Sequence, residues 1–255
     1  MRVREDKARS IVLVTGNAAK AEIAGTHLAT FGYVVRQEPL AVPEIQSLDP
    51  SEVVAHKARE AFNRLGRELI VEDFGLAIEE LADFPGALVK FVLASMGPQG
   101  LCVLGDQTTS RSCRFLGALA HVDSHGAVTT FSTRGRRFTL ASRPAPDLTG
   151  GTWSPLWTVI IPPGCQEPIS AEDALVRERF AARWQATSVY AKLGAWLTGT
   201  AGADTRLRES GWARSVVDAA RGERKQPSVE DSEPVPPDSN IIEQKRRWQP
   251  RRSSS

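Results

Sequence analysis

Long apolar runs are absent from this sequence of 255 residues. No stretch approaches the roughly 18 apolar residues that a membrane-spanning helix needs, so we expect no membrane span. The first ten residues, MRVREDKARS, are charged and lack the apolar segment of a secretory signal peptide. We therefore expect no such signal.

Cysteine and histidine are also scarce. The 3 cysteines, Cys102, Cys113 and Cys165, are odd in number and widely spaced. This favours free thiols and a cytoplasmic location over a disulfide framework or a zinc site. All 4 histidines precede residue 126, which excludes a catalytic histidine from the C-terminal half. The net charge of +2 gives no overall argument for binding nucleic acid or membrane.

What is present suits a folded domain, since 41% of the residues are hydrophobic. Strand and helix patterns alternate along the chain, then a hairpin and further helices follow, which predicts a mixed α/β domain. The expected elements are a strand within 9–16, a helix ending at Gly32, a strand at 33–37, a helix at 49–66, a strand at 67–78, a short helix at 84–97, two strands within 114–140 joined by a turn at 123–126, a loop at 142–168 and a helix at 170–196.

Helix-capping residues mark two of these helices. Asp49 is a typical N-cap, with Pro50 at the first helical position, Glu52 three residues after the cap and Gly66 at the end. Ser170 is the expected N-cap of the last helix.

The two ends of the chain differ from its middle. We expect an N-terminal extension at 1–10, a folded domain at 11–198 and a charged tail rich in Pro and Ser at 199–255. From about residue 221 the tail has too few apolar residues to repay its ordering entropy, so we predict disorder there. Its basic end, KRRWQPRR, either contacts a nucleic acid or acidic partner or is simply solvated.

The stretch IVLVTGNAAKAE runs from a predicted strand into a predicted helix. Thr15 and Asn17 lie at the turn, where backbone N–H groups and the helix dipole favour an anion, and Lys20 follows in the first helical turn. This predicts a phosphate site. An ordinary N-cap at Asn17 with a solvated Lys20 is the alternative.

Two adjacent acids, Glu72 and Asp73, interrupt the apolar run LIVEDFGLAI. Buried carboxylates are costly unless paired, and Mg²⁺ often binds one or two carboxylates together with substrate phosphates. Together with Glu44, whose loop we expect nearby, they predict a magnesium site; a surface turn is the alternative. Lys57 borders the apolar face of its helix and either lies along the surface or points into a cleft.

Taken in order, these segments resemble the inosine triphosphatase/Ham1 family of nucleoside triphosphate pyrophosphatases. The family's [ST]-x-N-x-x-K turn resembles Thr15 to Lys20, and its acidic strand resembles Glu72 to Leu76 except at Phe74. The other matching segments are Pro43-Glu44, Lys57-Ala58, Pro85-Gly86, Arg111 to Phe115 and Trp153 to Pro155.

The resemblance implies an elongated α/β fold with a mixed sheet and two lobes around a central cleft, commonly a homodimer. It implies Mg²⁺-dependent cleavage of a nucleoside triphosphate into monophosphate and pyrophosphate, with Mn²⁺ as a possible substitute. The implied roles are phosphate binding by Thr15, Asn17, Lys20 and Lys57, metal binding by Glu44, Glu72 and Asp73, catalysis by Asp73 and Glu72, and contact with the base by Trp153, Ser154 and Arg179.

The base-reading half departs from the family pattern. Of the family's E-K-N-x-x-S-H-R run, only Glu172 and Arg179 match, and Ser154 replaces the expected Asp of the base-side loop. A hydrogen-bonding pocket rejects ligands that leave its polar groups unpaired, so exchanging those groups predicts an altered or relaxed base preference. The alternative is a non-catalytic nucleotide-binding or interaction protein on the same fold, for which Phe74 beside the acids is one reason.

Overall fold

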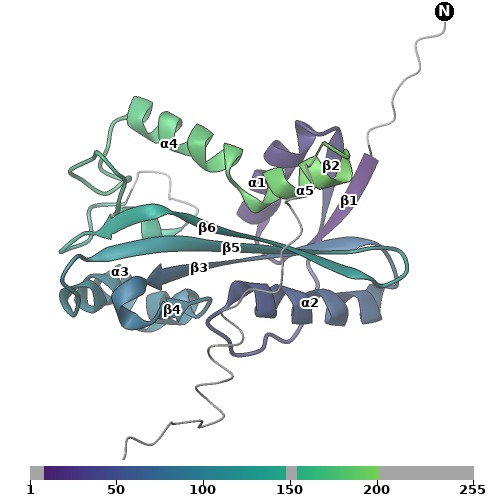
Figure 1. Ribbon diagram of the computed structural model, residues 1–255, viewed down its shortest axis with the longest axis horizontal. Helices are drawn as coiled ribbons and strands as arrows, with labels where there is room; N and C mark the ends of the chain where they lie inside the picture. Colours follow the sequence, from purple (N-terminus) through teal and green to yellow (C-terminus); the bar gives the residue numbers. More distant parts are fainter. Residues whose placement is uncertain (1–8, 148–153, 201–255) are drawn as a thin grey trace, which may run out of the picture. The chain divides into compact units, whose positions relative to one another are not determined.

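The computed structural model describes residues 9–147 and 154–200, which contain one mixed β-sheet flanked by helices (Figure 1). Its strands follow the order β2-β1-β3-β5-β6-β7, and β4 pairs with β3 outside this path. Their bounds are β1 Arg9–Val14, β2 Tyr33–Glu38, β3 Leu69–Ile78, β4 Pro85–Gly86, β5 Ser112–Val122, β6 Val128–Leu140 and β7 Ile160–Ile161.

The sheet is parallel at one end and antiparallel at the other. β1 runs parallel to both β2 and β3, because helices return the chain between these strands. β3, β5, β6 and β7 pair antiparallel, and the turn at 123–126 joins β5 to β6 as predicted. The predicted mixed α/β class is confirmed.

Helices cover both faces of the sheet. Figure 1 shows α2 and α3 on one side and α1, α4 and α5 on the other. The bounds are α1 Ala18–Ala29, α2 Pro50–Leu65, α3 Val89–Asp106, α4 Ala174–Ala186 and α5 Val189–Leu197, with 3₁₀ turns η1 Glu79–Leu81 and η2 Pro155–Thr158. α1 and α5 bury Leu28 and Leu193 beside Leu119 of β5, whereas α2 buries Val54 beside Ala120 on the opposite face.

The ends of α2 follow the capping residues that the sequence contains. The Asp49 carboxylate accepts a hydrogen bond from the Ser51 N–H at 2.8 Å, and Gly66 ends the helix with a φ of 61°. Glu52 accepts from the Ser47 hydroxyl, which in turn accepts from the Asp49 N–H. The acid therefore supports the cap through Ser47.

The predicted boundaries of two helices were wrong. Pro85 and Gly86 form the short strand β4, and α3 begins only at Val89 and continues past a break at Gly97, whose φ is 63°. The last helix is capped by Asp173, whose carboxylate accepts the Val176 N–H at 2.8 Å, and not by Ser170. A second cap at Ser188 divides it into α4 and α5.

The predicted ends of the domain lie near the limits of the described residues. β1 already begins at Arg9, inside the predicted extension, and residues 1–8 lie outside the described part. The predicted disordered tail from 221 and the base-side residue Trp153 also lie outside it. Within the described residues, no helix combines the length and apolar character needed to cross a membrane.

Candidate active site

The turn after β1 is capped by its own side chains. Asn17 Oδ1 accepts hydrogen bonds from the backbone N–H groups of Ala19 and Lys20 at 3.0 and 3.3 Å. Thr15 Oγ1 accepts the Asn17 N–H at 3.1 Å. Asn17 is therefore an N-cap, as the alternative interpretation held. The cap also fixes the N-terminus of α1, with its positive dipole end, at the end of β1.

Lys20 is not a solvated surface residue. Its Nζ lies 3.3 Å from Glu72 Oε1 and 4.0 Å from Asp73 Oδ1. Burial lowers the pKa of Lys20, but the two carboxylates outweigh it, so the pKa is raised above its ordinary value of 10.5. Lys20 therefore keeps its positive charge beside the two acids.

The acids continue β3 beyond the end of β1. Leu13, next to the last residue of β1, pairs with Ile70, so Glu72 and Asp73 lie past the point where the parallel partner stops. Successive side chains of a strand point to opposite faces. Glu72 accordingly meets Tyr190 of α5, whereas Asp73 is affected by the charge of Lys57 on α2. The surface-turn alternative is wrong, because these residues lie within β3.

The two carboxylates differ in access to solvent. The Glu72 side chain is 1% exposed and that of Asp73 is 16% exposed. Tyr190 donates a hydrogen bond to Glu72 Oε2 at 3.2 Å, and Asp73 Oδ1 accepts the Phe74 N–H at 3.0 Å. Burial raises the pKa of both carboxyl groups despite the charge of Lys20.

Glu44 lies between two lysines. It accepts a hydrogen bond from Lys57 Nζ at 2.7 Å and a second one from Lys90. Burial raises the pKa of Glu44, but the hydrogen bonds and charges of both lysines outweigh it and lower the pKa to about 2. Lys57 thus points toward the Glu44 loop. Lys90 joins the site from α3 and had no place in the prediction.

The predicted metal set of Glu44, Glu72 and Asp73 is not assembled as a three-carboxylate cage. Across residues 9–147 and 154–200, no three side chains of His, Cys, Asp or Glu converge closely enough to hold an ion. The lysines neutralise Glu44 instead. Glu72 Oε1 is buried and has the Lys20 ammonium 3.3 Å away as its ion-pair partner, and the same ammonium lies 4.0 Å from Asp73 Oδ1. The two carboxylates fit Mg²⁺ shared with substrate phosphates.

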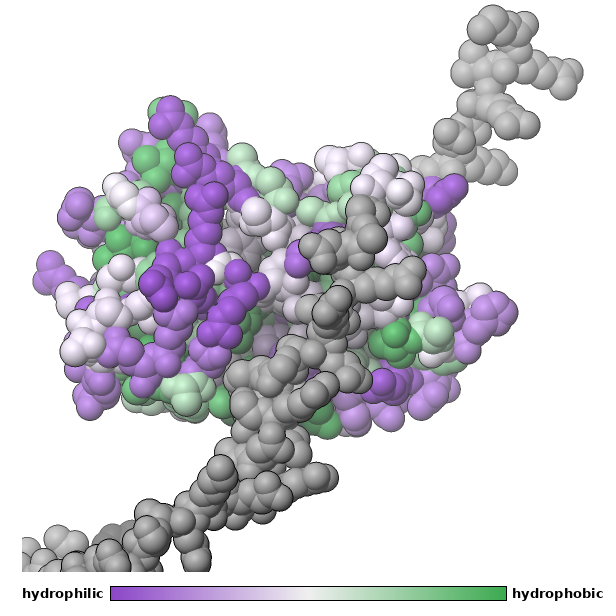
Figure 2. All heavy atoms as spheres, viewed as in Figure 1, coloured by the Kyte–Doolittle hydropathy of each residue, from purple (hydrophilic) through white to green (hydrophobic). Residues whose placement is uncertain are grey.

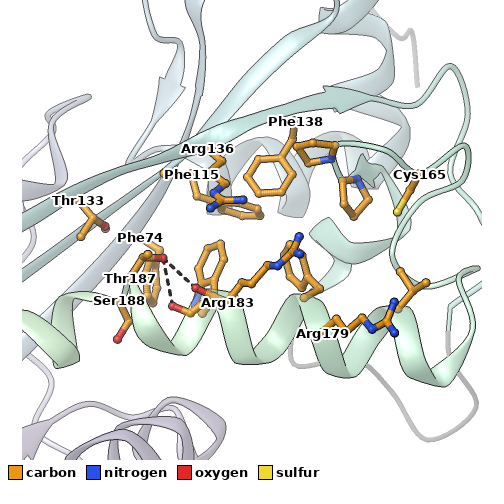
Figure 3. Close-up of a pocket in the computed structure, with 17 residues that line it drawn as sticks. Phe74, Phe115, Thr133, Arg136, Phe138, Cys165, Arg179, Arg183, Thr187 and Ser188 are labelled. Atoms are coloured by element: carbon orange, nitrogen blue, oxygen red, sulfur yellow. Dashed lines mark hydrogen bonds between the residues drawn. The ribbon is translucent and has the colours of Figure 1, made fainter.

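A pocket of about 230 Å³ opens next to the acids, between α4 and the strands β5 and β6 (Figure 3). Phe74, which follows Asp73, forms part of its wall, and its ring centroid lies 6.1 Å from that of Trp184 on α4. The remaining lining residues are Phe115, Gly117, Thr133, Gly135, Arg136, Phe138, Pro162, Pro163, Cys165, Val176, Arg179, Phe180, Arg183, Thr187 and Ser188.

Of the described residues predicted to contact the base, Arg179 lines the pocket and Ser154 does not. Ser154 is buried away from it, where its hydroxyl accepts the Leu156 N–H at 3.3 Å. Trp157, the other loop tryptophan, packs against Phe115 and Phe180 and so covers the core.

Comparison with known proteins identifies the family. The sequence model of the Ham1 family matches residues 11–142, the segment that contains the capped turn and both acids. The chain belongs to the Ham1 family. A dITP/XTP pyrophosphatase of Hyperthermus butylicus is 31% identical over 181 residues, which are 71% of this chain and 92% of that protein. A dITP/XTP pyrophosphatase of Methanopyrus kandleri is 34% identical over 128 residues, or 49% of this chain and 68% of that protein.

Solved structures agree with the family fold. The chain is similar to a HAM1 protein from Coxiella burnetii, with a TM-score of 0.58 and 18% identity over 75% of this chain and 99% of that one. It is also similar to a nucleoside-triphosphatase from Mycobacterium abscessus, with a TM-score of 0.55 and 21% identity over 69% of this chain and 96% of that one. The fold predicted from the resemblance is confirmed.

The residues expected to bind phosphate lie closer together than those expected to contact the base. Thr15, Asn17 and Lys20 lie on one turn beside the acids, as the motif order predicts. Three residues of the candidate site have no place in the sequence prediction: Lys90, Arg183 and Tyr190. Tyr190 had one available signal, since it is a hydroxyl-bearing residue in the apolar helix VYAKLGAWL.

Proposed function

We propose that this chain hydrolyses a nucleoside triphosphate to the monophosphate and pyrophosphate, with Mg²⁺ or, in its place, Mn²⁺. One observation carries the proposal. Lys20, in the first turn of α1, forms ion pairs with Glu72 and Asp73 near the C-terminal end of β1. The names of its relatives support it, since they include dITP/XTP pyrophosphatases and an inosine triphosphate pyrophosphatase of Kluyveromyces lactis.

The capped turn supplies donors for the triphosphate. Thr15 accepts a hydrogen bond through its hydroxyl oxygen, so its own proton stays available for a phosphate oxygen. Asn17 uses Oδ1 for capping, which leaves its amide N–H groups for the same purpose. Lys20 and Lys57 supply positive charge from α1 and α2.

Asp73 is the better candidate to activate water. Its side chain is the more exposed of the two acids, and its raised pKa makes the carboxylate a stronger proton acceptor. In the proposed reaction Asp73 takes a proton from water as the oxygen attacks the α-phosphorus. The bond to the bridging oxygen breaks, and pyrophosphate leaves.

Glu72 has a supporting part in this scheme. It is buried, paired with Lys20 and hydrogen-bonded to Tyr190, so it fixes the position of Lys20 and shares metal binding with Asp73. A bound Mg²⁺ would neutralise phosphate charge and orient the water. Glu44 holds Lys57 and Lys90 toward the same opening.

The pocket beside Phe74 is the proposed site of the base. Five aromatic side chains are among its lining residues, and of the family's base-reading run it keeps Arg179. This composition supports the proposal of an altered or relaxed base preference, because aromatic rings stack on any base.

A substrate panel with Asp73→Asn tests this function. We expect pyrophosphate release from at least one canonical, deaminated or modified triphosphate, and a loss of about 10²- to 10⁴-fold in kcat for the variant. Asp106→Asn is the matched control, since Asp106 pairs with Arg111 away from the site. Thermal melting should show that Asp73→Asn remains folded.

Two results would contradict the proposal. An absence of turnover with either metal, despite nucleotide binding, would favour the non-catalytic alternative. Full activity in Asp73→Asn would show that another group activates the water.

A homodimer remains a further implication of the resemblance, and a cytoplasmic location remains an expectation from the cysteine pattern. The exposed apolar side chains of Phe91, Met96 and Val103 on α3 support a dimer, because a second copy would remove them from water. Sedimentation velocity at micromolar concentration would detect it, and a monomer there would count against it.

A further inference from the structure

The pocket beside Phe74 carries an excess of positive charge. Arg136, Arg179 and Arg183 line it, and no Asp or Glu is among its lining residues. Within the described part of the chain, none of these three guanidinium groups forms a salt bridge. The neighbouring arginines of β6 differ, since Arg134 pairs with Asp83 at 2.7 Å and Arg137 with Glu79 at 3.0 Å.

Arg136 lies in a β-bulge of β6, between the salt-bridged Arg134 and Arg137. Arg114 of β5 pairs with Arg137, but Leu116 pairs with Arg134, so two residues of β6 lie opposite Phe115. The extra residue changes which side chains share a face. Gly135 and Arg136 therefore both line the pocket, and beyond the bulge the regular alternation places Phe138 in the pocket and Arg137 beside Glu79.

Arg183 extends into the pocket from α4, opposite Arg136 on β6. Figure 3 shows the guanidinium groups of Arg136 and Arg183 extending into the pocket from β6 and α4, while Arg179 lies farther along α4. Phe115 lies between these two elements in the same view. Hydrophilic residues also cover much of the surface over α4, with apolar residues showing between them (Figure 2).

The combination of aromatic walls and arginines that form no salt bridge within the described residues suits a flat ring that bears a negatively charged group. The aromatic walls offer stacking surfaces, and a guanidinium group binds a carboxylate through directed, charge-assisted hydrogen bonds. Two cations on facing elements repel each other, and an anion between them removes that repulsion. A neutral base would gain from the stacking surfaces alone.

We propose that the pocket selects a base bearing a negative charge, so that the preferred substrate is a nucleoside triphosphate with an acidic group on its ring. Arg136 and Arg183 are the residues that determine this specificity. The inference rests on the proposed function, in that the triphosphate occupies the capped turn while the base enters the pocket.

Two matched nucleotide pairs test the preference. Orotidine and uridine triphosphates differ by one ring carboxylate, and xanthosine and inosine triphosphates differ by an oxo group that lets xanthine lose a proton near neutral pH. We expect kcat/KM to be about tenfold to a hundredfold higher for the acidic member of whichever ring type is turned over. The corresponding monophosphates, tested by calorimetry, provide a readout that needs no turnover.

Arginine variants connect the preference to the pocket. Arg136→Gln and Arg183→Gln should each bring the ratio between acidic and neutral partners at least fivefold closer to one, in both kcat/KM and monophosphate affinity. Arg137→Gln is the matched control from the same strand, and it should keep the ratio of the unmodified chain.

The two proposals fail in different ways. Equal handling of acidic and neutral partners by an active enzyme would overturn this inference and leave the proposed function standing. A preference that survives both pocket variants would also overturn it. Tight, selective binding of the acidic monophosphates without any turnover would contradict the proposed function and support the pocket assignment.

Discussion

At the scale of single residues, adjacent acids on one strand have different surroundings. Glu72 is enclosed by Tyr190 and Lys20, whereas Asp73 keeps contact with solvent beside the opening of the site. A buried carboxylate with fixed partners positions its neighbours, and an accessible one with a raised pKa can accept a proton. This difference in access, and not residue type, separates the two proposed roles.

The hydroxyl of Tyr190 should matter for stability. Tyr190→Phe leaves Glu72 Oε2 without its donor in a buried position, which we expect to lower the free energy of unfolding by about 1–3 kcal/mol. Chemical denaturation measures the change. Tyr33→Phe is the control, because the Tyr33 hydroxyl accepts only a 3.4 Å hydrogen bond from Arg9 at the sheet edge. Equal losses in both variants would contradict a special role for Tyr190.

At the scale of elements, close backbone contacts bring Lys90 and Glu44 together. A Cβ on Gly75 of β3 would lie 2.7 Å from the backbone of Gly86, and one on Gly86 would lie 2.3 Å from Leu48 O. β3, β4 and the loop before α2 therefore pack backbone to backbone. Through this contact Lys90, at the start of α3, reaches Glu44.

Gly75 should accordingly resist substitution. We expect Gly75→Ala to cost about 2 kcal/mol or more, because the added methyl meets backbone atoms that cannot move aside easily. Gly25→Ala on α1 is the control: nothing lies within 4 Å of the added carbon, and alanine favours a helix by roughly 0.5–1 kcal/mol. Thermal melting compares them. An unchanged Gly75→Ala would show that β4 can separate from β3.

At the scale of the whole described chain, α1 and α5 both supply partners of Glu72: α1 supplies Lys20 and α5 supplies Tyr190. His27 Nδ1 of α1 lies 2.8 Å from Ser188 Oγ, the N-cap of α5, and its ring meets that of Tyr190 edge-on with centroids 5.5 Å apart. α5 in turn supplies Tyr190 to Glu72. The junction between these helices therefore holds the buried acid in place.

The stability that this junction contributes should depend on pH. Burial lowers the pKa of His27 below its ordinary value of 6.5, so the unfolded chain binds a proton more readily than the folded one. The associated stability is present above pH 6.5 and decreases as the pH falls below it, by at most about 1.4 kcal/mol per pH unit.

His27→Asn should remove this contribution. Denaturation at pH 5 and pH 7 measures it as the difference between the variant and the unmodified chain, with the exposed His125→Asn as control. An identical pH dependence in His27→Asn and the unmodified chain would mean that His27 does not titrate differently on folding.

The sequence determined much of the fold and the turn that we propose binds phosphate. The caps Asp49, Gly66 and Asn17 act on residues within a few positions, so their effect could be predicted locally. Motif order placed Lys20 near Glu72-Asp73 for a related reason, since a βαβ crossover leaves little freedom in where its turns lie. The Ser170 cap was wrong because a nearer acid, Asp173, competed for the same helix.

Only the tertiary structure decided the partners of these residues. Glu44 accepts a hydrogen bond from Lys90, a residue 46 positions away that the contact between β3 and β4 brings beside it. Gly135 and Arg136 would point to opposite faces of a regular strand, yet the bulge between β5 and β6 lets both line the pocket. Capping residues act on the few positions next to them, whereas charge pairing and burial depend on contacts between distant segments that no local pattern encodes.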